Sequence, residues 1–288
     1  MATAKEGIKQ KVHGWSHHDS ADLYGIDDWG NGYFRISKKG EVNVRLNDED
    51  GGKKDVSLCD LLEGLKERGT TVPVLFRFRD LLRSRIAELN DSFRKAIKEA
   101  GYQGKYQGVY PIKVNQQRQV VEEIAEFGTK YDYGLEAGSK PELIAAMAHM
   151  HNPNAYLICN GYKDDEFIDL ALTAQKMGLN IFIVLEMPSE LDVIMERARR
   201  MDIRPNLGVR VKLAAKGSGL WQESAGDKSV FGLNAAQVVD VVDKLKQVDA
   251  LDCLKLLHYH QGSQIPNISV VREGLTEAVR IYVDLVKE

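Results

Sequence analysis

From Val109 onward, short apolar runs rich in β-branched residues alternate with stretches whose apolar residues recur at helical spacing. The runs recur at intervals of roughly 25 residues, which is typical of βα units and predicts a parallel sheet. A final helix is expected at Val270 to Lys287. The expected strands are Gly108 to Lys113, Tyr133 to Ala137, Ala155 to Asn160, Ile181 to Glu186, Leu207 to Leu213 and Lys255 to His260.

A different pattern precedes this region. Within Trp29 to Leu46, two alternating runs on either side of Lys39-Gly40 predict a β-hairpin. An acidic loop, a helix, a strand and a long amphipathic helix are expected to follow, at Asn47 to Gly52, Leu58 to Arg68, Val74 to Phe78 and Leu81 to Ala100. We therefore divide the chain into an amino-terminal β-hairpin segment, residues 1–72, and a βα-rich region, residues 73–288.

Polar residues at the strand ends distinguish between two architectures that use this alternation. In a closed (β/α)8 barrel the carboxyl ends of all strands contribute to one site, whereas a doubly wound sheet concentrates its site at one crevice. No GxGxxG follows the first strand. We predict an α/β fold, a (β/α)8 TIM-type barrel of which about six of eight units are present. The polar residues are Lys113, Glu136, Asn160, Glu186, Arg210 and His260.

Composition excludes several classes of function. The 288 residues are 43% hydrophobic and 28% charged, with a net charge of −3. The lysines and arginines are scattered and form no basic stripe that would indicate binding to nucleic acid or to a lipid surface. The apolar runs are too short to span a membrane, and Met1 to His18 lacks the apolar centre of a signal peptide. A cytoplasmic protein without disulfides or a zinc site is expected, because its three cysteines are far apart: Cys59, Cys159 and Cys253.

Lys113 carries the strongest chemical signal, because it ends an apolar run where a strand gives way to a helix. A buried, unpaired ammonium costs several kcal/mol to desolvate, so such a lysine is expected to have a depressed pKa or a covalent partner. Pyridoxal phosphate binds to lysines of this kind as a Schiff base. The alternative is a lysine whose stem lies along the strand end while its ammonium reaches solvent.

Four motifs in order resemble biosynthetic arginine decarboxylases, which belong to the fold-type III pyridoxal phosphate enzymes. The resemblance runs from about Tyr24 to the last residue. It implies decarboxylation of L-arginine to agmatine and carbon dioxide for polyamine biosynthesis, with pyridoxal phosphate and magnesium as cofactors, in a homo-oligomer. The motifs are Tyr-Pro-Ile-Lys-Val-Asn-Gln at 110–116, Gly-Leu-Glu-Ala-Gly-Ser-Lys at 134–140, Cys-Asn-Gly-Tyr-Lys-Asp at 159–164 and His-Tyr-His-Gln-Gly-Ser-Gln at 258–264.

The resemblance also implies roles for individual residues. Lys113 would hold the cofactor covalently, and His260 would lie flat against its ring, although a core histidine bonded to a backbone carbonyl fits the sequence equally well. Gly262 and Ser263 would meet the phosphate near a helix amino terminus, where the alternative is an ordinary serine N-cap. His258 would face the same way as His260 without a catalytic role.

Two further residues, Arg210 and Glu136, are expected to form a pair beside the cofactor, or else a plain structural salt bridge. Asn160 would cover the edge of the ring. The glycine-bearing segment Lys216 to Lys228 is expected to be a mobile lid or a long loop. Lys163 precedes two aspartates and is expected at a solvated helix start.

The resemblance leaves alternatives open and makes one demand on the fold. Another fold-type III decarboxylase, acting on diaminopimelate or ornithine, and a non-catalytic pyridoxal phosphate-binding barrel remain candidates. Six strands leave a barrel with two open edges, which parallel strands buried on both faces tolerate poorly. We expect a truncated chain that binds the cofactor weakly and forms no agmatine alone, and whose hairpin segment lacks the β-domain it should join. The sequence indicates neither the magnesium ligands nor the carboxylates that bind the guanidinium.

Overall fold

The computed structural model describes residues 14–47, 52–214, 229–263, 265 and 267–288. The chain divides into two compact units, Met1–Arg85 and Ile86–Glu288. The long helix α4 (Arg79–Ala100) contains the division between them and matches the amphipathic helix expected from the sequence.

The first unit contains a three-stranded antiparallel sheet with the order β1-β2-β3. The expected hairpin is confirmed: Phe34 pairs with Val44, and the Ser37 amide donates to the Glu41 carbonyl across the turn. The elements of this unit are α1 (His17–Leu23), α2 (Ile26–Gly30), β1 (Phe34–Ile36), β2 (Val42–Asn47), β3 (Lys53–Ser57) and α3 (Leu58–Glu67).

Strand β3 was not expected, because its sequence is dominated by charge. The structure shows what stabilises it: Asp55 lies opposite Arg45 on β2 and forms ion pairs with Arg45 and with Arg35 of β1. A charged strand at the edge of a sheet also resists pairing with another chain. Cross-strand partners, which lie far apart in sequence, therefore define this element.

The strand expected at Val74 to Phe78 is wrong, because these residues form no regular structure. Their apolar character resembles that of a strand, but they make no ladder hydrogen bonds with another segment. Strand propensity reflects packing against neighbouring strands more than a preference of the backbone itself.

The second unit is built on a six-stranded parallel sheet in which the strands follow one another in sequence order. The predicted α/β fold is confirmed, and β4 and β9 are the two open edges of the described sheet. Each strand lies within a few residues of its expected position. The strands are β4 (Val109–Pro111), β5 (Gly134–Ala137), β6 (Tyr156–Cys159), β7 (Asn180–Leu185), β8 (Leu207–Val211) and β9 (Leu254–Tyr259).

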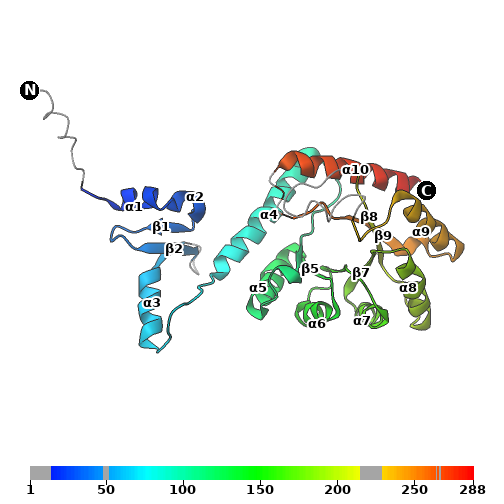
Figure 1. Cartoon of the computed structure of the whole chain (residues 1–288), viewed down its shortest axis with the longest axis horizontal. Coiled ribbons are helices and arrows are strands. Elements are labelled where there is room, and N and C mark those ends of the chain that lie inside the picture. The colour runs from blue at the N-terminus through cyan, green and yellow to red at the C-terminus, as the bar shows by residue number, and fades with distance from the viewer. Residues whose placement is uncertain (1–13, 48–51, 215–228, 264, 266) are drawn as a thin grey trace, which may run out of the picture. The chain divides into compact units, whose positions relative to one another are not determined.

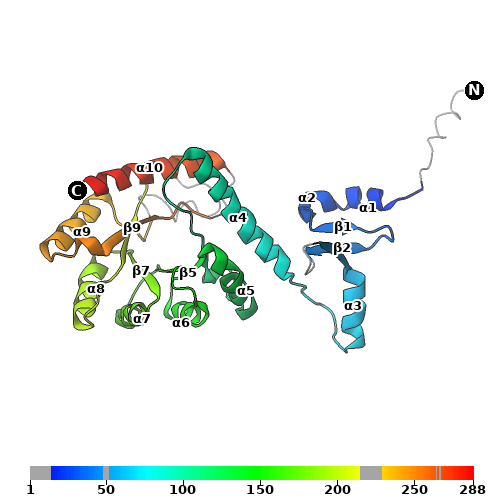
Figure 2. The same ribbon diagram turned by 180° about the vertical axis from the view of Figure 1, so that it is seen from behind.

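Helices follow the strands and lie along one side of the sheet, where α5 to α9 form an arc (Figures 1 and 2). Short 3-10 turns at Ile112–Val114, Thr129–Tyr131 and Leu251–Cys253 complete the connections. No described helix has both the length and the apolarity needed to cross a membrane. The helices are α5 (Arg118–Gly128), α6 (Lys140–His149), α7 (Asp165–Lys176), α8 (Ser189–Arg200), α9 (Ala235–Gln247) and α10 (Ile268–Lys287).

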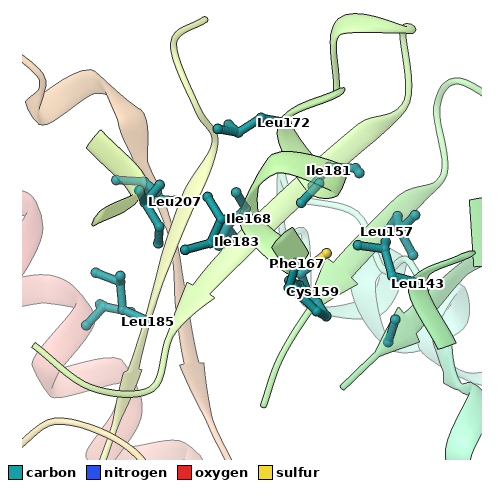
Figure 3. Close-up of a cluster of buried hydrophobic side chains, with 14 of the residues drawn as sticks. Leu143, Leu157, Cys159, Phe167, Ile168, Leu172, Ile181, Ile183, Leu185 and Leu207 are labelled. Atoms are coloured by element: carbon teal, nitrogen blue, oxygen red, sulfur yellow. The ribbon is translucent and has the colours of Figure 1, made fainter. Parts of the chain in front are cut away.

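The hydrophobic core lies between the sheet and these helices (Figure 3). Alternate residues of each strand point into it, so that Ile181, Ile183 and Leu185 of β7 are fully buried. Helix α7 contributes Phe167 and Ile168 to the same cluster. Because successive strand residues point to opposite faces, the residues between them face the other side of the sheet.

Replacing Ile183 with alanine is expected to lower the free energy of unfolding by about 2 to 5 kcal/mol, because the cavity left in a close-packed core cannot fully collapse. The control is Ile144→Ala, since the Ile144 side chain on α6 is 58% exposed. That change is expected to stay within about 0.5 kcal/mol. Urea unfolding followed by circular dichroism measures both, and equal losses would contradict the core assignment.

Candidate active site

The carboxyl ends of the strands surround a cavity of about 910 Å³ in the second unit. Apolar side chains of Val109, Ile158 and Leu256 form part of its wall. Seven polar side chains from all six strands or the residues after them also line it: Lys113, Glu136, Asn160, Glu186, Arg210, His258 and His260. The six strand-end residues named from the sequence thus meet at one site.

Strand parity explains why these residues meet. On β5, Leu135 and Ala137 are completely buried toward the helices, so Glu136 between them faces the cavity. On β6 the same alternation brings Ile158 and then Asn160 to the cavity. A shift of one residue in any strand would exchange the polar and apolar faces.

Lys113 was expected at the end of a strand, but it lies in the 3-10 turn Ile112–Val114, two residues beyond the end of β4. The expectation of a buried ammonium is wrong, because the lysine is largely exposed while still lining the cavity. The turn places the residue after the end of the strand, where its long, flexible side chain is exposed and lines the cavity. The amine is therefore accessible to a ligand.

The buried Glu136 and the half-buried Asn160 form a polar pair in the wall of the cavity. Asn160 Nδ2 donates to Glu136 Oε1 at 3.2 Å, while Glu136 Oε2 and Asn160 Oδ1 are buried without a hydrogen-bond partner. Burial raises the pKa of Glu136, and the nearby Lys113 charge opposes this shift. Buried acceptors without partners are costly and indicate a site prepared for a donor.

Arg210 pairs with Glu186 and not with Glu136, so the expected pairing is wrong. Its Nη1 lies 2.9 Å from Glu186 Oε2, and the Glu186 side chain is completely buried. Glu186 Oε1 also accepts a hydrogen bond of 2.8 Å from the Gly161 amide. The guanidinium lies 5.8 Å from the centre of the Phe231 ring. Arg210 is held because the adjacent strand β7 supplies its partner.

The two histidines lie at the end of β9 and face the cavity, as their common parity predicts. Burial lowers the pKa of His258 to about 3, assisted by the positive charge of Arg210, and its Nδ1 atom has no partner. Burial also lowers the pKa of His260, with Arg210 and Lys113 adding to the shift. Both rings are therefore neutral near pH 7.

Gly262 and Ser263 follow β9 but are not among the residues that line the cavity. Gly262 has a φ of 116°, a backbone conformation that favours glycine. Ser263 is not a helix cap, because Asn267 caps α10 through a bond from the Ser269 amide. The alternative reading of Ser263 as an N-cap is thus wrong. The segment expected as a lid or a long loop, Lys216 to Lys228, lies outside the described residues.

Lys163 was expected at a solvated helix start, and this expectation is wrong. The side chain is completely buried, and its ammonium donates to the carbonyls of Gly161 and Val184. Asp164 caps α7 instead, by accepting a hydrogen bond from the Phe167 amide at 2.9 Å. The local sequence suggests an exposed lysine because two aspartates follow it. It does not reveal the partners of Lys163 on β7 and α8, which lie farther along the chain.

Glu186 and His258 line the cavity, although neither of them was assigned an individual role in the site from the sequence. The signal for Glu186 was present, since a charged residue directly after an apolar run is also what singled out Lys113. Among the described residues, no group of three or more histidine, cysteine, aspartate or glutamate side chains is arranged to hold a metal ion.

Comparison with known proteins decides the family. The model of the pyridoxal-dependent decarboxylase family, pyridoxal binding domain, matches residues 84–288. The chain belongs to the pyridoxal-dependent decarboxylases. The resemblance seen in the motifs is also confirmed: the chain is 50% identical over 94% of its length to the biosynthetic arginine decarboxylase of Gloeobacter violaceus. It is 46% identical to arginine decarboxylase 1 of rice, over 99% of its length.

Solved structures support the same family. The biosynthetic arginine decarboxylase of Campylobacter jejuni matches with a TM-score of 0.81 and 37% identity, over 92% of this chain and 42% of that one. The diaminopimelate decarboxylase of M. jannaschii shares the fold, with a TM-score of 0.61 at 20% identity, over 90% of this chain and 54% of that one. The chain spans 42% of the length of both curated relatives named above.

Glu136→Gln is expected to stabilise the ligand-free protein above neutral pH, by about 1 kcal/mol, the lower end of the cost of an unpaired buried polar group. Because the folded-state pKa is raised, the wild type loses stability as pH rises through that pKa, whereas glutamine does not titrate. The advantage of the variant should shrink as pH falls toward the ordinary carboxyl pKa.

The measurement is thermal or urea unfolding between pH 4 and pH 8.5. The exposed Glu99 on α4 provides the control, and Glu99→Gln should leave the difference from wild type flat with pH. An advantage for Glu136→Gln that grows toward acid pH would contradict the assignment of a desolvated carboxylate.

Proposed function

We propose that the whole protein to which this chain contributes decarboxylates L-arginine to agmatine and carbon dioxide with pyridoxal phosphate, and so supplies polyamine biosynthesis. The observation that carries the proposal is the convergence of Lys113, Glu136, Arg210 and His260 on one cavity, in a member of the pyridoxal-dependent decarboxylase family. The identity of 46% to 50% with arginine decarboxylases supports arginine as the substrate.

The residues present fit the cofactor. A cavity of about 910 Å³ is ample for a ligand of this size, since ligand pockets usually span about 300 to 1,000 Å³. The unpartnered acceptors on Glu136, Asn160 and His258 offer positions for donors of a polar ligand. The accessible amine of Lys113 lies on the same cavity, where it can meet an aldehyde.

Lys113 would hold the cofactor covalently, and neutral His260 would pack against its ring. Arg210, held by Glu186, and the pair formed by Glu136 and Asn160 would fix its polar edge. Gly262 and Ser263 remain the proposed phosphate contacts. They lie three and four residues after the end of β9, and their backbone amides and the Ser263 hydroxyl lie outside any regular element.

When bound, pyridoxal phosphate supplies a conjugated, electron-withdrawing system that stabilises the negative charge left on Cα by departing carbon dioxide. The protein selects the bond that breaks by orienting the substrate carboxylate. Apolar side chains of Ile158, Leu256 and Val109 line the cavity and would limit the water around the substrate carboxylate, which favours loss of its charge. Lys113 lines the cavity, and its amine would carry the proton that replaces the carboxyl group at Cα.

Two further features are proposed on the resemblance alone: a homo-oligomeric assembly and a role for magnesium. A cytoplasmic location is proposed from the wide spacing of the three cysteines. A second candidate function is another fold-type III decarboxylase, acting on diaminopimelate or ornithine. The shared fold with the M. jannaschii enzyme keeps this alternative in view.

Borohydride reduction of the cofactor-loaded whole protein is expected to leave a pyridoxyl label on Lys113. Lys105 also lines the cavity and is the competing amine. Peptide mapping should find the label in wild type and in Lys105→Ala, and lose it in Lys113→Ala. A label that stays in Lys113→Ala and disappears in Lys105→Ala would overturn the assignment.

The whole protein is expected to prefer arginine to ornithine and lysine by well over tenfold. A site built around the planar, five-donor guanidinium leaves acceptors unpaired when an ammonium binds, at about 1 to 3 kcal/mol for each buried group. Competition assays that measure released carbon dioxide test this preference. Equal turnover of ornithine would favour the second candidate function.

A further inference from the structure

Lys163 is a buried lysine that does not line the cavity, although the preceding Gly161 and Tyr162 do. Its ammonium donates to the Gly161 carbonyl at 2.7 Å and to the Val184 carbonyl of β7. It also lies 3.5 Å from Glu190 Oε2, and both side chains are at least 97% buried. Burial lowers its pKa, and the charges of Glu190 and Glu186 oppose that shift.

Glu190 extends this contact to the cavity. Its Oε2 accepts from the Glu186 amide at 2.7 Å, and its Oε1 accepts from the Lys163 amide at 3.3 Å. Glu186 then accepts from Gly161 and from Arg210. One chain of charge-assisted bonds thus links the loop after β6, the end of β7, the start of α8 and the arginine of β8.

The four charged side chains in this series of hydrogen bonds balance each other's charge. Lys163 and Arg210 carry two positive charges, and Glu186 and Glu190 carry two negative charges, with no side chain more than 13% exposed. Removing one member of a buried ionic set is far more harmful than removing a balanced pair, because it leaves a charge uncompensated. The charge balance among the four side chains therefore depends on Lys163.

The position of Gly161 gives the network a direct effect on the cavity. Gly161 has a φ of 76°, and a Cβ at this position would lie 2.4 Å from the Gly138 carbonyl oxygen, so the loop passes close to the end of β5. Lys163 holds the carbonyl of this glycine, and Glu186 holds its amide. Both flanking residues, Asn160 and Tyr162, line the cavity.

We propose that Lys163 is a positioning residue, whose buried ammonium holds the Gly161 carbonyl and Glu190, and through Glu190 holds Glu186 and Arg210, in the arrangement that binds the cofactor. This role rests on the proposed function. Lys163 does not itself contact the ligand, because its ammonium is enclosed by two carbonyls and a carboxylate. It is thereby distinct from Lys113, whose amine is accessible.

The test compares pyridoxal phosphate binding by the whole protein with that of three variants, measured by equilibrium dialysis and absorbance. Lys163→Met keeps most of the side-chain volume and removes the charge. Lys163→Met combined with Glu190→Gln removes a balanced pair. Lys140→Met is the matched control, because Lys140 is an exposed lysine that pairs with Asp164 and Glu166 beside the same loop.

Lys163→Met should weaken binding at pH 8 by tenfold or more, and the double variant should return to within about threefold of wild type. Lys140→Met should stay within about twofold.

The ratio of the dissociation constants of Lys163→Met and wild type should also rise from pH 6 to pH 8.5. In Lys163→Met, Glu186 and Glu190 share a single cation, Arg210, so the second carboxylate to ionise is repelled by the first.

The charged and titratable groups around Lys163 could also affect the pH dependence of binding. The double variant should lack the pH-dependent rise, since it keeps only the pair of Glu186 and Arg210. The remaining neighbours are common to all variants: Cys159 on β6, whose pKa burial raises to about 12, Glu136 on β5 and His258 on β9.

A purely space-filling role predicts a different result: a ratio that does not change with pH, and a double variant no better than Lys163→Met. Either finding would overturn the proposal. If Lys163→Met proves insoluble, Glu190→Gln alone replaces it. Tighter binding by the double variant than by Glu190→Gln then supports the charge balance, and no recovery overturns it.

The proposed function fails separately. A wild-type protein that binds pyridoxal phosphate but releases no carbon dioxide from arginine would refute arginine decarboxylation, while the comparison of binding constants would still decide the role of Lys163. Absence of pyridoxal phosphate binding by wild type would overturn both.

Discussion

The alternation of side chains along parallel strands is the constraint on which the second unit depends. Each strand turns one set of residues toward the helices and the other toward the cavity. Leu135 and Ala137 are packed under α5 and α6, while Glu136 between them lines the cavity. Stability and chemistry are thus distributed to opposite faces of the same strands, and a residue inserted into a strand would damage both.

Charge balance is the second requirement, and it links the site to the layer beneath it. Glu136 is buried with an unpartnered oxygen, whereas Glu186 is fully compensated by Arg210 and the Gly161 amide. The first carboxylate is prepared for a ligand, and the second supports the structure that receives one. The buried Lys163 extends this support to α8, so residues outside the cavity influence the geometry within it.

The sequence predicted helices and strands well where the apolar periodicity was strong. It predicted them poorly where contacts with another strand decided whether a strand forms. All six parallel strands and the hairpin about Gly40 were expected, because apolar periodicity is a local signal. Strand β3 was missed, since ion pairs to Arg35 and Arg45 compensate for its charged sequence. The apolar stretch from Val74 to Phe78 failed for the opposite reason, as it makes no ladder bonds to another strand.

For the site, the sequence by itself determined which strand-end residues reach the cavity, because strand parity is a property of the local chain, but it did not place Gly262 and Ser263, which do not line the cavity. Lys113, Glu136, Asn160, Arg210 and His260 all line it as expected. Only the tertiary structure decided which charged side chains form ion pairs with each other. Arg210 bonds Glu186, and Lys163 is buried instead of solvated, because these contacts join different βα units. Burial and pairing depend on distances between segments that the order of residues does not specify.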